Sequence, residues 1–231
     1  MLRWRPDFWP STNETPFERP WLEVGWALLS MLGVLLVGQL YARGIRLPAT
    51  GALRPLPESV NQVVIFAPML ALLALRHHSL ETAWIRRHRV PLRIGIGVVL
   101  ATIAITAFTA VYRDALALGT VISRTYRPAN THIAIQVLLE DIAIAILMVR
   151  LAAALGPRRA ILLVAALFAA GHLPSLLATG GTQAELISLI RDAALAAGVF
   201  AVALRGADVW VLWPVHFAMD MMQFAIPGRQ P

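Results

Sequence analysis

The residues best suited to chemistry in this chain are acidic and imidazole side chains inside apolar stretches of sequence. They are Glu140, His172, His216 and Asp220. Ionised or strongly polar groups are costly to place in an apolar environment unless they face a partner or water. Because His216 and Asp220 are four residues apart, a helix would present them on one face. These residues are therefore expected to gather at one site.

Two kinds of hydrolytic chemistry are open to such a set. A carboxylate beside an imidazole can deprotonate water, and Glu140 with His172 is the expected pair. His216 could then donate to the oxygen that gains negative charge. Alternatively, Glu140, His172, His216 and Asp220 could ligate a divalent metal such as zinc, which itself acidifies water. The chain has no cysteine, so any metal must use such ligands. Both routes lead to hydrolysis of an acyl bond, with a peptide bond as the expected substrate.

Other interpretations of the same residues are structural. Asp141 lies about 100° from Glu140 around a helix, so the two carboxylates are not expected to point the same way. They could instead pair with Arg150 or Arg191 as links between helices. A single intramembrane His often forms only an interhelical hydrogen bond. A proton or ion pathway lined by these groups is a further alternative.

The elements that must position these residues are expected to be membrane-spanning helices. Of the 231 residues, 58% are hydrophobic and 14% are charged, whereas soluble domains average about 25% charged residues. The apolar residues gather in segments of roughly the 20-residue length that crosses a bilayer as helix. The predicted fold is an all-α, polytopic transmembrane helix bundle with about seven spans. The seven are Trp21–Leu40, Val60–Leu75, Ile94–Tyr112, Thr131–Leu151, Ala160–Leu177, Ala184–Leu204 and Val209–Ile226.

Charge supports a membrane environment rather than nucleic-acid binding. The net charge is +7, every basic residue is Arg, and the arginines lie mainly between the apolar segments. Cations in such loops orient helices and contact anionic lipid. We expect a multi-pass protein of the bacterial inner (plasma) membrane, with the N-terminus inside. The expected organisation is a polar segment 1–20, N-terminal transmembrane helices 21–130, a catalytic core 131–226 and a tail 227–231.

The C-terminal half also resembles a known family. Its motifs are Glu140-Asp141, then Phe168-Ala-Ala-Gly-His172, then His216-Phe-Ala-Met-Asp220. In this order they are similar to the Glu-Glu-x-x-x-Arg, Phe-x-x-x-His and His-x-x-x-Asn/Asp motifs of the CAAX protease and bacteriocin-processing (CPBP, Abi-like) intramembrane proteases. The resemblance covers about residues 133–224.

The resemblance implies an intramembrane endopeptidase that cleaves a membrane-associated, prenylated or leader peptide. Glu140 and His172 would activate the water, and His216 with Asp220 would bind the oxyanion or complete the site. Asp141 would be the second acid, and Phe168 and Arg150 would support the site. The family includes proteins described as metalloproteases, so zinc is a possible cofactor.

The chain departs from the family pattern at three positions. Asp141 replaces the second Glu, Asp220 stands where Asn is common, and Ala145 stands where the motif has Arg. A catalytically degenerate relative that regulates or binds another membrane protein is therefore the alternative function.

Overall fold

The fold was examined in a computed structural model of the chain. It describes residues 20–42, 57–76, 80–111, 117–171, 173, 187, 189–190, 193–194, 196–201 and 208–223. Within these ranges the regular elements are all helices, and no strand occurs. The all-α prediction is confirmed for this part of the chain. The polar segment 1–19 and the tail 227–231 lie outside the described residues.

The helices follow the predicted apolar segments closely in the first half of the chain. Since a spanning segment needs a long unbroken apolar run, its ends are marked by polar residues, Pro and Gly. In chain order the elements are α1 (Pro20–Ala42), α3 (Pro57–Leu75), η1 (Leu80–Ala83), α4 (Val90–Val111), α5 (Leu118–Thr125), η2 (Pro128–Asn130), α6 (Thr131–Leu155), α7 (Pro157–Ala170) and α10 (Val209–Gln223).

Agreement is poorer in the second half. The predicted fifth span, Ala160–Leu177, corresponds to α7, which begins earlier and ends at Ala170. Gly171 follows that helix directly. Of the predicted sixth span, Ala184–Leu204, the structure describes residues 187, 189–190, 193–194 and 196–201, and these residues are helical. The short helix α5 was not predicted because its 8 residues contain no long apolar run.

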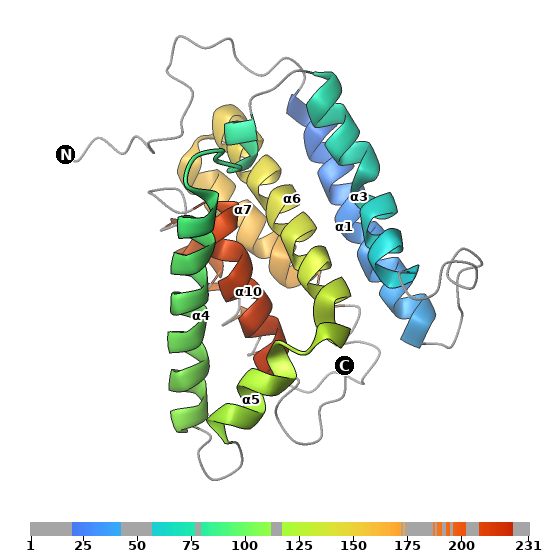
Figure 1. The fold of residues 1–231 in the computed structure, drawn as a ribbon. Helices are drawn as coiled ribbons and strands as arrows, with labels where there is room; N and C mark the ends of the chain where they lie inside the picture. Colours follow the sequence, from blue (N-terminus) through green and yellow to red (C-terminus); the bar gives the residue numbers. More distant parts are fainter. Residues whose placement is uncertain are drawn as a thin grey trace, which may run out of the picture.

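Helix α6 is the centre of the structure. It packs against α1, α3, α7 and α10, and Figure 1 shows it between the α1–α3 pair and the α4–α10 pair. Every residue from Asp141 to Ala152 is buried. A helix that is enclosed on all sides must be apolar nearly all round, which explains the Ile, Ala and Leu of this stretch. Any polar group that α6 carries here is therefore an interior group.

Helix α10 is held at its start by the segment that precedes α4 and by the first turn of α4. The Val209 amide donates to the Trp84 carbonyl oxygen at 3.1 Å, and the Trp210 indole N–H donates to the Arg86 carbonyl oxygen at 2.9 Å. Arg93 Nη1 lies 2.6 Å from a carboxylate oxygen of the fully buried Asp208. These contacts fix where α10 begins and therefore which residues of α10 lie beside a given residue of α6.

Two described helices are long and apolar enough to cross a membrane. They are Pro20–Val37 within α1 and Val90–Val111, which is α4. Only 28% and 22% of these stretches are buried inside the protein, so most of their apolar side chains face outward. The predicted number of about seven spans is not reached in the described part of the chain. Helix α6 carries three charged residues, and α7 and α10 have only 14 and 15 residues.

The contact between α4 and α10 depends on Gly97. A Cβ atom at this position would lie 2.6 Å from the Val211 carbonyl oxygen and 2.9 Å from Cγ of Pro214. Backbone atoms cannot move aside as the end of a long side chain can, so the two helices approach this closely only because residue 97 has no side chain. Gly95, on the same helix, has no such neighbour within 4 Å.

A Gly97→Ala substitution should therefore force α4 and α10 apart. We expect it to lower the free energy of unfolding by about 1–3 kcal/mol, as overpacking typically does. Thermal unfolding of the purified protein in detergent measures this effect. Gly95→Ala is the matched control and should leave the melting temperature unchanged or raise it. Equal destabilisation by both substitutions would contradict the close contact.

Candidate functional site

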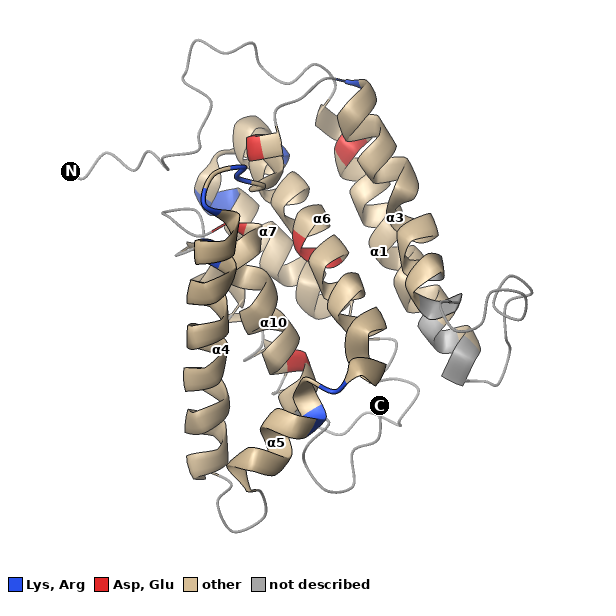
Figure 2. Cartoon of the chain, viewed as in Figure 1, with Lys and Arg blue, Asp and Glu red and all other residues tan. Residues whose placement is uncertain are grey.

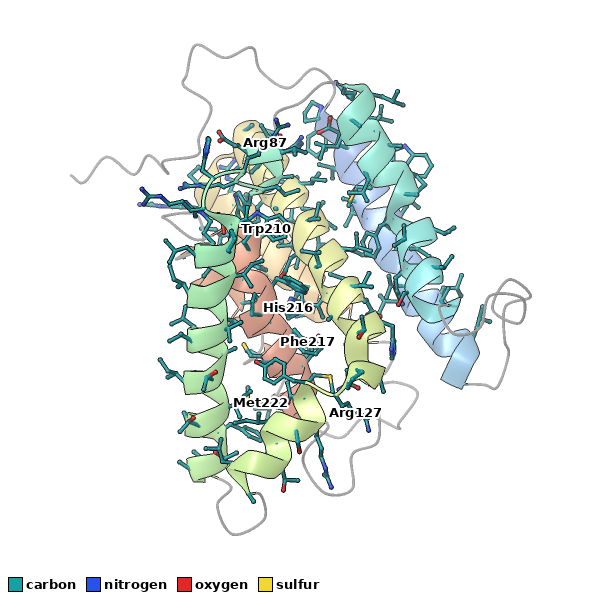
Figure 3. The ribbon with its side chains drawn as sticks, in the orientation of Figure 1. Arg87, Arg127, Trp210, His216, Phe217 and Met222 are labelled. Carbon is teal, nitrogen blue, oxygen red and sulfur yellow. The ribbon has the colours of Figure 1, made fainter. Side chains whose placement is uncertain are left out.

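The structure brings four of the predicted site residues together where α6 meets α10. Glu140 and Asp141 come from the middle of α6, and His216 and Asp220 from α10. Figure 3 shows His216 and Phe217 on the part of α10 that faces α6. His172 lies outside the described residues, so the structure does not place it.

His216 is oriented by Asp141. Its Nδ1 lies 2.8 Å from Oδ1 of Asp141, and both side chains are largely buried. Because an ionised carboxylate can only accept a hydrogen bond, Nδ1 is the donor in this pair. The other ring nitrogen, Nε2, lies 3.7 Å from Oδ1 of Asp220. The ring is thus fixed by one carboxylate while its second nitrogen faces another.

Glu140 forms a cluster with His216 and Asp220. One potential metal-ligand atom from each of Glu140, His216 and Asp220 lies within 4.8 Å of the other two. The sequence suggested that Glu140 and Asp141 would point apart. Both nevertheless approach the same imidazole.

Two aromatic side chains fix the position of the imidazole further. The rings of Phe168 and His216 are 5.9 Å apart between centroids and meet edge to face. The indole N–H of Trp213 donates to the Ala134 carbonyl oxygen at 2.7 Å and so sets how α10 lies along α6. Phe168 from α7 therefore contacts the His216 ring, and edge-to-face contacts of this kind favour one ring orientation.

The sequence interpretation missed two site residues, Gln62 and Gln136. Gln136 Nε2 donates to Oε1 of Glu140 at 2.8 Å, and Gln62 Nε2 on α3 donates to Oε1 of Gln136 at 3.0 Å. A signal for Gln136 was present in the sequence: it stands four residues before Glu140, on the same helical face. Gln62 had no such signal beyond its polarity, because the local sequence does not indicate that α3 packs against α6.

Arg150 does not belong to this site, contrary to its predicted supporting role there. Ten residues separate it from Glu140, about 15 Å along a helix. Its fully buried guanidinium group pairs with Glu23 of α1 and donates to the Thr82 carbonyl oxygen. It also donates to the Thr82 hydroxyl group at 3.2 Å. Arg150 therefore links α1, η1 and α6. It does not take the place of the motif Arg, whose position in this chain is occupied by Ala145. Arg191 lies outside the described residues.

The donor set is compatible with a divalent metal. Catalytic zinc commonly has three protein ligands from imidazole and carboxylate groups and one open position, and Glu140, His216 and Asp220 offer that chemistry. The hydrogen bond from His216 to Asp141 resembles the outer carboxylate that orients many metal-bound imidazoles. Asp141 Oδ2 is buried without a hydrogen-bond partner in the structure. These residues thus fit a zinc ion as well as a metal-free site.

Comparison with known proteins adds no relative. No family model, curated protein or solved structure matches the chain.

The Arg150 cluster provides a stability test away from the site. Arg150→Met should lower the free energy of unfolding by about 3 kcal/mol, because it leaves the Glu23 carboxylate buried without its nearest cation. Combining it with Glu23→Leu, which removes that carboxylate, should restore most of the loss. Thermal unfolding of both single variants and the double variant gives the coupling. Strictly additive losses would contradict a buried ion pair.

Proposed function

We propose that the chain is an intramembrane endopeptidase of the CPBP type. Its substrate would be a peptide bond in a membrane-associated, prenylated or leader peptide. The observation that carries this proposal is the meeting of two adjacent carboxylates on α6 with an imidazole and a third carboxylate on α10. A carboxylate beside an oriented imidazole provides a proton acceptor for water and a hydrogen-bond donor for the oxyanion.

The proposed reaction begins at Glu140. Its carboxylate accepts a proton from water as the water oxygen bonds to the peptide carbonyl carbon. The carbonyl oxygen becomes an oxyanion, which accepts a hydrogen bond from Nε2–H of the His216 imidazolium. Asp141 and Asp220 stabilise that cation. The C–N bond then breaks as Glu140 returns its proton to the leaving nitrogen. His172, through the family resemblance, would help Glu140 orient the water.

The same residues could act with a bound metal. Glu140, His216 and Asp220 would hold a zinc ion, with His172 as a further candidate ligand. Such an ion would lower the pKa of water and polarise the carbonyl group. Asp141 would then act by orienting the His216 ring.

We further infer a multi-pass protein of the bacterial plasma membrane with about seven spans. The outward apolar surfaces of α1 and α4 support this. Arginines also concentrate at the end where α4 begins (Figure 2), and this end would face the cytoplasm. The described arginines there are Arg76, Arg86, Arg87, Arg89, Arg93, Arg158 and Arg159, whereas the opposite end has Arg124 and Arg127.

Peptide hydrolysis by the purified protein tests the proposed activity. Glu140→Gln should reduce kcat/KM by about 10²–10⁴-fold, the usual effect of losing a general acid-base group. Glu81→Gln is the matched control, because Glu81 is exposed in η1, and it should leave hydrolysis unchanged. Cleavage can be followed by mass spectrometry with prenylated and leader peptides in detergent, with and without added zinc.

Equal cleavage by wild type and Glu140→Gln would contradict an enzymatic role for Glu140. The alternative, a degenerate member that acts by binding another membrane protein, predicts full complementation of a deletion strain by Glu140→Gln. The endopeptidase predicts loss of complementation by the same variant.

The proposed orientation can be tested with single cysteines, because the chain contains none. Ser123→Cys lies on α5, near the end of α4, and Arg87→Cys lies before its start. In intact spheroplasts a membrane-impermeant maleimide should label Ser123→Cys and spare Arg87→Cys, whereas inverted vesicles should show the reverse. Both positions reacting from one side would contradict a spanning α4. Labelling of Arg87→Cys in spheroplasts and of Ser123→Cys in inverted vesicles would contradict the proposed orientation.

A further inference from the structure

The Glu140 carboxylate is held by a directional chain of amides. Gln136 Nε2 donates to Glu140 Oε1 at 2.8 Å, and Gln62 Nε2 donates to Gln136 Oε1 at 3.0 Å. A carboxylate only accepts, so Gln136 must turn its NH₂ group toward Glu140 and its oxygen toward Gln62. That oxygen then requires a donor, which Gln62 supplies. The orientation of each amide follows from the acid.

The position of Gln62 extends the site beyond α6 and α10. Gln62 is 9% exposed and belongs to α3, which lies outside the residues that resemble the CPBP family. Its own Oε1 is buried without a hydrogen-bond partner in the structure. A glutamine that leaves an acceptor unsatisfied bears a desolvation cost, which its donation to Gln136 helps to offset. Apolar residues at both positions would avoid that cost.

We infer that Gln136 and Gln62 are positioning residues for Glu140, so that α3 takes part in organising the site. The kinetic part of this inference rests on the proposed function. Ala145 stands where the family motif has Arg and cannot form a hydrogen bond with its side chain. Glu140 instead accepts a hydrogen bond from Gln136, which Gln62 in turn orients. Loss of either amide frees the carboxylate to adopt other rotamers.

The test compares Gln136→Met and Gln62→Met, which keep the side-chain length and remove the amide. Ser30→Ala is the control, because Ser30 Oγ donates to the Ile65 carbonyl oxygen and so also joins α1 to α3. The first measurement is the carboxyl ¹³C NMR resonance of Glu140 in protein labelled at glutamate, assigned with Glu140→Gln. It needs no enzymatic activity.

We expect both glutamine substitutions to move the Glu140 resonance and Ser30→Ala to leave it in place. In the peptide assay, Gln136→Met should lower kcat about tenfold with little change in KM, since a hydrogen bond to a charged group has about that effect. Gln62→Met should act in the same direction and more weakly. If the wild type cleaves no peptide, the proposed function fails while the resonance still decides this inference.

An unmoved Glu140 resonance in Gln136→Met would overturn the inference, as would an equal movement in Ser30→Ala. If Gln136→Met does not fold, Gln62→Met decides by the same criterion. Gln62 is separated from Glu140 by one more hydrogen bond than Gln136 is.

Discussion

Every charged group inside an apolar bundle must have a partner, and the rest of this structure is arranged to provide one. An unpaired ion in such surroundings is strongly unfavourable. The fully buried Arg150 is bonded to Glu23 and Thr82, the buried Asp208 to Arg93, and His216 to Asp141. Each pair joins segments that are distant in sequence. The buried charges are therefore paired across helices that are far apart in the sequence.

The same requirement gives the site its order. Helix α10 begins where Val209 and Trp210 are bonded to the segment before α4 and Asp208 is bonded to Arg93 in the first turn of α4. It lies close to α4 because Gly97 has no side chain. With its start and its distance fixed, α10 brings His216 to the level of Asp141 on α6. Small errors in these contacts would separate the imidazole from both carboxylates, and catalytic constellations tolerate little displacement.

Much of this arrangement could be expected from the sequence, and the reasons for the rest are physical. Apolar runs located α1, α3, α4 and α6, and polar residues inside such runs identified Glu140, Asp141, His216 and Asp220. The sequence did not indicate that Arg150 pairs with Glu23, because the two are 127 residues apart. It also missed Gln62, which reaches the site only through the packing of α3 on α6.

If α6 and α10 form one catalytic unit, substitutions on the two helices should affect hydrolysis together. Peptide hydrolysis can be compared among Glu140→Gln, His216→Ala and the variant with both changes. Groups that act together are strongly non-additive, so losing the second adds little once the first is gone. The rate of hydrolysis by the double variant should therefore be about equal to that of the less active single variant. Losses that multiply would show that the two residues act independently and would contradict a shared site.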